Sequence, residues 1–215
     1  MALFFGYDPG GDGANGVAQL EIDLATGRAL QVSTKLAATA SAALEYFSAA
    51  LATSPAAGIG VDTLTEWSMG SAGWRPADRW LREKYAAVAK SVVSPNAIFG
   101  AMSLNGMSVV HALRQRDAAL VVSETHPKVL YFALAGTKYD WNDSRQSMIA
   151  WLNELLGGAT LGSVTDDEFD AVLSAWTCAQ GVAGRWTRDL HASNAGDGIA
   201  GAPIRPAGPT NYFWP

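Results

Sequence analysis

Three short apolar segments of this chain each lead into an acidic residue, and this repeated pattern constrains the fold more than any other feature. The segments and their acids are residues 3–7 with Asp8, residues 57–61 with Asp62, and residues 118–122 with Glu124. Short apolar runs are typical of strands buried on both faces of a sheet. A carboxylate after such a strand lies at the rim of the core, where its charge is costly unless a metal, hydrogen bonds or a cation meets it. The alternative for Asp8 is that it caps the following turn.

The rest of the apolar pattern predicts an α/β chain with one mixed sheet. Residues 17–22 and 29–33 resemble strands, and their short connections to residues 3–7 predict an antiparallel meander. Helical spacing predicts helices at residues 35–53, 76–90, 104–116, 128–134 and 143–156. Because crossover connections are right-handed, the two later strands should run parallel to the first. Their acidic ends then meet at one edge of the sheet, where ligands of open α/β sheets bind.

A last helix is predicted to begin after Thr165, and it carries more acids. Thr165 and Glu168 have the spacing of a capping box, and Asp166 and Asp167 suit the positive end of the helix dipole. Asp170 lacks such an explanation, because it lies one turn further on, beside the other two aspartates, where like charges repel. Acids on one helix face favour a cation between them. The sequence does not decide whether Asp166 or Asp167 turns toward the site.

Carboxylates that converge without basic partners are the ligands that Mg²⁺ or Mn²⁺ prefers. We therefore expect a divalent-metal site built from the strand-end acids and the acids of the last helix. Two such ions about 3.5–4 Å apart can activate a water and stabilise a leaving oxygen in phosphodiester cleavage. Metal binding would also hold the acids ionised against their mutual repulsion.

The composition predicts one globular domain. The chain has 215 residues, of which 49% are hydrophobic and 16% charged, and we expect the domain to span residues 1–191. Residues 192–215 are rich in Gly and Pro and are predicted to form a tail packed on it. Cys178 is the only cysteine, the N-terminus lacks the basic region of a signal peptide, and no apolar run is long enough for a membrane span. These features predict a cytoplasmic protein without membrane contact.

Basic residues near these motifs are candidates for substrate binding. Arg75, Arg79 and Lys128 are candidates to contact a phosphate. Local ion pairs at a helix start explain the two arginines equally well, and an ordinary surface lysine explains Lys128 better. The formal net charge of −5 opposes nonspecific nucleic-acid binding. A nucleic-acid partner would therefore have a limited contact surface. A homodimer is compatible with the aromatic residues in the loops but is not required by them.

Several motifs resemble known families. GYDPG resembles the first strand of RuvC-type resolvases and other RNase-H-like nucleases, and DDEFDA resembles the Asp-x-x-Asp-Ala of their last helix. With GVDTLT, WRPADRWLR and SETHPKV, the ordered set resembles the domain-of-unknown-function family 429, whose members are predicted RNase-H-like nucleases. The resemblance implies an RNase-H-like mixed sheet with helices on both faces, and metal-dependent nuclease chemistry. The implied site residues are Asp8, Asp62, Asp167 and Asp170, with Asp166 competing with Asp167 and Glu124 a fifth candidate ligand.

Two other functions remain open. Actin-like and sugar-kinase-like proteins handle ATP and also begin with Gly-x-Asp-x-Gly, but they need two such domains, and 215 residues hold one. A non-catalytic binding module with the same fold is the third hypothesis, and the acidic net charge favours it. Nucleotide binding would support the ATP hypothesis, and salt-insensitive protein binding would support the module.

Overall fold

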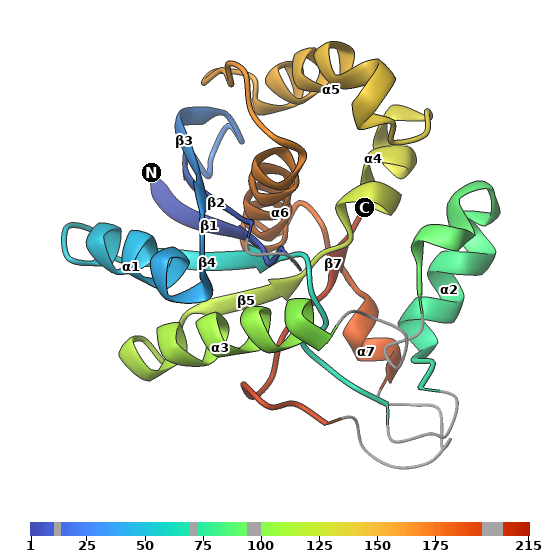
Figure 1. Cartoon of the computed structure of the whole chain (residues 1–215), viewed down its shortest axis with the longest axis horizontal. Coiled ribbons are helices and arrows are strands. Elements are labelled where there is room, and N and C mark those ends of the chain that lie inside the picture. Colours follow the sequence, from blue (N-terminus) through green and yellow to red (C-terminus); the bar gives the residue numbers. More distant parts are fainter. Residues whose placement is uncertain (11–13, 69–72, 94–99, 195–203) are drawn as a thin grey trace.

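The computed structural model describes residues 1–10, 14–68, 73–93, 100–194 and 204–215 (Figure 1). Its main sheet has five strands in the order β3-β2-β1-β4-β5. Their bounds are β1 Ala2–Asp8, β2 Asn15–Ile22, β3 Ala29–Ala37, β4 Ala56–Val61 and β5 Val121–Glu124. β1, β2 and β3 form the predicted antiparallel meander, and β4 and β5 are parallel to β1. The predicted RNase-H-like mixed sheet is thus confirmed.

The third parallel strand begins later than the sequence pattern predicted. Residues 118–120 form a turn, in which Asp117 accepts hydrogen bonds from the backbone N–H of Ala119 at its side chain and of Leu120 at its carbonyl. β5 therefore includes Glu124, which was expected just beyond the strand.

Helices cover both faces of the sheet, as expected. In Figure 1, α1 and α3 lie on one side, and α6 lies on the other with α4 and α5 farther out. The bounds are α1 Ala40–Leu51, α2 Pro76–Lys84, α3 Gly100–Arg116, α4 Pro127–Ala135, α5 Trp141–Leu156, α6 Asp166–Val182 and α7 Leu190–Asn194, with a 3₁₀ helix η1 at Ala86–Ser91. Two predicted helices are shorter. The first starts at Ala40 because β3 continues to Ala37, and the second stops at Lys84 before η1.

Residues of β1 alternate between two apolar cores. Phe4 belongs to the core under α6, whereas Phe5 and Tyr7 belong to the core under α1 and α3. This alternation follows from the period of two along a strand. Both faces of β1 are thus buried, as the apolar opening of the chain predicted.

Helix α6 packs directly on the sheet backbone. A Cβ atom at Gly6 would lie 1.8 Å from the carbonyl oxygen of Ala171, and one at Gly60 would lie 1.9 Å from that of Ser174. Only glycine at these two positions allows so close an approach. This contact fixes the height and rotation of α6, and it places Asp170, which precedes Ala171, beside the end of β1.

The C-terminal segment lies along β5. The backbone N–H of Asn211 donates to Val122, and the N–H of Glu124 donates to Asn211. Further on, β7 (Phe213–Trp214) pairs with β6 (Arg188–Asp189). Residues 195–203 of the predicted tail lie outside the described residues, and the boundary at residue 191 stays a prediction. Among the helices that the structure describes, none is long and apolar enough to cross a membrane.

Candidate metal centre

Three of the predicted acids, Asp8, Asp62 and Asp170, meet at one edge of the sheet. Asp8 ends β1, Asp62 directly follows β4, and Asp170 lies in the second turn of α6. The backbone N–H of Asp62 donates to the carbonyl of Tyr7 at 2.9 Å, which keeps the two strand ends side by side. The glycine contacts under α6 bring Asp170 to the same place.

Their carboxylates form a compact group. One oxygen from each of Asp8, Asp62 and Asp170 lies within 4.8 Å of the other two. Asp8 and Asp170 are buried, and Oδ1 of Asp170 has no hydrogen-bond partner. None of the three forms an ion pair among the described residues. The site is therefore a set of two buried carboxylates and one half-buried carboxylate without a protein cation bonded to it.

The electrostatics reflect this lack of compensation. Burial raises the pKa of Asp8 well above its ordinary value, and the charges of Asp62 and Asp170 raise it further. Burial and the charge of Asp62 likewise raise the pKa of Asp170. Burial also raises the pKa of Asp62, although His126 and Lys128 lower it in part. Without a metal, the folded protein therefore resists full ionisation of the group.

The other two acids of α6 lie at the same cavity, but not in the compact group. Asp166 and Asp167 line a cavity of about 560 Å³ together with the three converging aspartates and Lys128. Asp166 is exposed and Asp167 is half-buried. Among the described residues, the convergence includes Asp8, Asp62 and Asp170 alone. The predicted roles of Asp166 and Asp167 stay predictions.

Lys128 faces this cavity from the first turn of α4. Partial desolvation lowers the pKa of Lys128, but the charges of Asp170, Asp62 and Asp8 outweigh this effect, and the net pKa is raised. Its ammonium lies 5.6 Å from the ring centroid of Tyr139. Lys128 is thus close enough to feel the carboxylates, yet it forms no ion pair with them.

Tyr139 is a site neighbour that the sequence reasoning missed. Its hydroxyl is buried without a hydrogen-bond partner, and burial and then the charge of Asp170 raise its pKa. Tyr139 lies in the connection between α4 and α5. Nothing in its sequence neighbourhood distinguishes it from an ordinary loop tyrosine, and only the packing of α4 and α5 on α6 brings it to Asp170.

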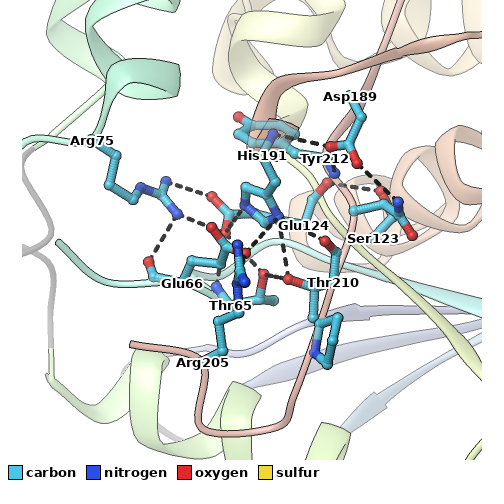
Figure 2. Close-up of polar contacts among 12 residues, drawn as sticks. Thr65, Glu66, Arg75, Ser123, Glu124, Asp189, His191, Arg205, Thr210 and Tyr212 are labelled. Carbon is cyan, nitrogen blue, oxygen red and sulfur yellow. Dashed lines mark hydrogen bonds and ion pairs between the residues drawn. The ribbon is translucent and has the colours of Figure 1, made fainter. Parts of the chain in front are cut away.

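Glu124 ends its strand like the other acids, but it is held in a separate ion-pair cluster (Figure 2). Its two carboxylate oxygens accept hydrogen bonds from Arg75 at 2.6 and 2.9 Å. Arg75 also donates two hydrogen bonds to Asp78 and one to the carbonyl of Glu66. All five N–H donors of the guanidinium are therefore used.

This cluster changes the interpretation of two predicted residues. Arg75 is only 2% exposed and has no free donor for a phosphate. Although burial raises the pKa of Glu124, the charges of Arg75 and His191 lower it well below its ordinary value. We therefore leave the predicted phosphate contact of Arg75 and the predicted metal contact of Glu124 out of the proposed site. Arg79, the third basic candidate, is exposed on α2 and does not line the cavity of the three aspartates.

The cluster also joins the C-terminal segment to the sheet edge. His191 in α7 contacts Glu124 at 3.3 Å, and Thr210 shares a hydrogen bond with Thr65 at 2.7 Å. Arg205 donates to the buried Glu66 at 2.5 Å. No local pattern predicts a role for His191, because its partner Glu124 lies 67 residues away in the chain.

The donor set at the three aspartates fits a divalent cation. Carboxylate oxygens are the hard ligands that Mg²⁺ and Mn²⁺ prefer. An ion there would compensate the buried charges and give the orphaned Oδ1 of Asp170 a partner. The structure is thus compatible with metal binding, and the choice of metal stays a prediction.

Comparisons with known proteins place the chain in a family. No curated protein matches it. A solved structure titled Thermus thermophilus RuvC structure is similar over 85% of this chain and 95% of its own, with 13% identity and a TM-score of 0.47. Residues 10–191 match the model of a family described as Protein of unknown function (DUF429). Because this match covers most of the chain, the protein belongs to the DUF429 family.

Proposed function

We propose that this protein is a divalent-metal-dependent nuclease that hydrolyses phosphodiester bonds of DNA or RNA. The observation that carries the proposal is the convergence of Asp8, Asp62 and Asp170 within 4.8 Å without an ion-pair partner among the described residues. Buried charges of one sign are retained at a cost in stability, and such sites are typical of function. The RNase-H-like sheet supports the proposal only by analogy.

The chain supplies a rigid set of ligands. Two of the carboxylates lie at the ends of adjacent parallel strands, and the third lies on a helix that contacts the sheet backbone directly. A bound Mg²⁺ or Mn²⁺ would activate a water and stabilise the leaving oxygen. Asp8, Asp62 and Asp170 would hold and orient the ion, and Lys128 would contribute a positive charge at the cavity for the non-bridging oxygens of the phosphate.

The test combines metal binding with hydrolysis. We expect Mg²⁺ or Mn²⁺ to raise the Tm of the protein and to support cleavage of a labelled oligonucleotide. Asp170→Asn removes a ligand charge and should lower the cleavage rate at least about 100-fold. Asp143→Asn is the matched control, because Asp143 is exposed on α5. It should leave both the Tm shift and the rate unchanged.

Two outcomes would contradict the proposal. One is a wild-type protein whose Tm does not respond to either metal. The other is an Asp170→Asn variant that cleaves as fast as the wild type, which would identify a contaminating nuclease or a different site.

A further inference from the structure

A second cavity beside the aspartates is lined by lysines. Lys90, Lys128 and Lys138 line a cavity of about 360 Å³ together with Tyr139. The three lysines come from η1, from α4 and from the connection between α4 and α5. Lys128 also lines the cavity of the three converging aspartates, so the two cavities meet at this residue. We call Lys90, Lys128 and Lys138 the lysine groove.

The lysines of the groove are not bonded to acids in the described part of the chain. Within the part of the chain that the structure describes, none of its three lysines forms an ion pair. All three are exposed. The neighbouring aspartates likewise form no ion pair. Among the described residues, the protein therefore keeps a positive set next to a negative set with no ion pair between them, although such pairs would stabilise both.

We propose, on the basis of the nuclease function above, that the lysine groove holds the phosphates of one polynucleotide strand next to the bond that is cleaved. A strand that crosses both cavities places anionic phosphates on the lysines and a metal-neutralised phosphate on the aspartates. A ligand with a single phosphate group can occupy the aspartate site without contacting Lys90 or Lys138. The arrangement therefore favours a polymer over a mononucleotide.

The size and charge of the protein restrict this substrate to a single strand. The net charge of −5 repels a polyanion over most of the surface. Three lysines match about three phosphates, and a cavity of about 360 Å³ holds part of one strand. A duplex would need a wider basic surface. We therefore expect the protein to prefer single strands to duplexes of the same length.

Tyr139 supports the groove and does not read bases. Its ring contacts the rings of Tyr131, Trp141 and Phe169. The ammonium of Lys128 lies over the same ring at 5.6 Å. These contacts leave the tyrosine as a support for Lys128 rather than a stacking platform. Recognition then falls on the backbone, and binding should tolerate changes of sequence.

The experiment measures strand binding apart from hydrolysis. Asp8→Asn/Asp170→Asn removes two carboxylates that repel a phosphate and two of the three proposed metal ligands, so strand binding can be followed without metal. The probes are labelled oligodeoxythymidylate and oligouridylate of about 12 nucleotides and a duplex of the same length. We expect both single strands to bind tighter than the duplex. The logarithm of affinity should fall with the logarithm of salt concentration with a slope of about −2, since each phosphate contributes about −0.7.

Charge removal in the groove tests the assignment. In the Asp8→Asn/Asp170→Asn background, the further substitutions Lys90→Ala/Lys138→Ala should weaken strand binding about tenfold. They should also reduce the slope of log affinity against log salt concentration to about −0.7. The control is Lys35→Ala/Lys84→Ala in the same background. It changes the net charge equally, at two exposed lysines that line neither cavity.

The lysine-groove proposal would be overturned if Lys90→Ala/Lys138→Ala and Lys35→Ala/Lys84→Ala lowered the strand affinity equally. Tighter binding of the duplex than of the single strands would also overturn it. This readout is independent of the nuclease proposal, whose own readouts are the metal-induced Tm shift and cleavage by the wild type. A protein that binds strands through the groove but never cleaves refutes the nuclease function alone. A protein that cleaves with unchanged rate and affinity after Lys90→Ala/Lys138→Ala refutes the groove alone.

Discussion

The ends of the three parallel strands carry acids in two contrasting environments. Glu124 at the end of β5 meets Arg75 in a bidentate ion pair and His191 at a third contact (Figure 2). Asp8 and Asp62, at the ends of β1 and β4, meet each other and Asp170 instead. The first acid has a lowered pKa, and the second group has raised pKa values.

This difference separates an acid with a structural role from the acids of the proposed metal site. A buried carboxylate with a full set of donors maintains the fold and has no capacity for a ligand. Buried carboxylates without donors destabilise the fold, and their retention indicates a ligand that compensates them. The two clusters therefore predict opposite responses to neutralisation.

Breaking the Arg75 cluster should have the largest effect. Arg75→Met removes the ion-pair partner of the buried Asp78 and leaves the buried Glu124 with His191 alone, and such a change costs about 3–5 kcal/mol. We expect the free energy of unfolding, measured by denaturant titration, to fall by this amount. Adding Glu124→Gln should restore part of it, because one of the buried charges then disappears. Arg79→Met, on the same helix at an exposed position, should change stability by less than about 0.5 kcal/mol.

A loss below about 1 kcal/mol for Arg75→Met would contradict the structural role of this cluster. It would also reopen Arg75 as a phosphate ligand, as the sequence first suggested.

Sequence reasoning reached the aspartates because each has a local signal. Asp8 and Asp62 follow apolar segments, and Asp170 lies on a capped helix beside like charges that local structure does not explain. The direction of the strands then follows from the handedness of crossovers. The location of the site was therefore predictable from short segments and one topological rule.

The same reasoning could not distinguish Glu124 from the aspartates. Arg75 lies 49 residues away in the chain from Glu124, and His191 lies 67 residues away. Which cation meets an acid depends on the packing of a long loop and of the C-terminal segment. Pattern-based reasoning has no access to such pairings, nor to the approach of Tyr139 to Asp170.

The next contrast between the two clusters concerns pH. Because the pKa values of Asp8 and Asp170 are raised above 3.8, the metal-free folded protein holds protons that the unfolded chain releases. Its stability should therefore fall as the pH rises from about 4 through the raised values. Glu124 acts in the opposite sense. The stability that ionised Glu124 contributes is present above its ordinary pKa of 4.5, and it is lost as the pH falls toward the lowered pKa.

Neutralising one aspartate sharpens this contrast. Asp8→Asn should raise the stability of the metal-free protein at pH 7 by about 1 kcal/mol and flatten its decline with pH. The Tm rise caused by Mn²⁺ should disappear in the same variant. Burial lowers the pKa of His191, but its bond to Glu124 outweighs burial and the net pKa is raised. The stability that protonated His191 contributes is therefore lost as the pH rises above 6.5. That loss is common to both proteins, and the difference between their pH curves isolates Asp8.

Asp143→Asn again serves as the control, and its pH curve should match that of the wild type. Lower stability of Asp8→Asn than of the wild type at pH 7 without metal would refute the repulsion on which the contrast depends.

The smallest effect should come from Tyr139, which lies at the border of the aspartate site. Burial and Asp62 raise the pKa of Asp170, and the nearby hydroxyl of Tyr139 lowers it in part. Because this hydroxyl favours the ionised form of a metal ligand, Tyr139→Phe should weaken Mn²⁺ binding about threefold. Metal-free stability should stay the same or rise slightly, since a buried hydroxyl without a partner is removed. Tyr131→Phe, in the same aromatic cluster, should leave the metal affinity unchanged, and equal affinities in all three proteins would reduce Tyr139 to a packing residue.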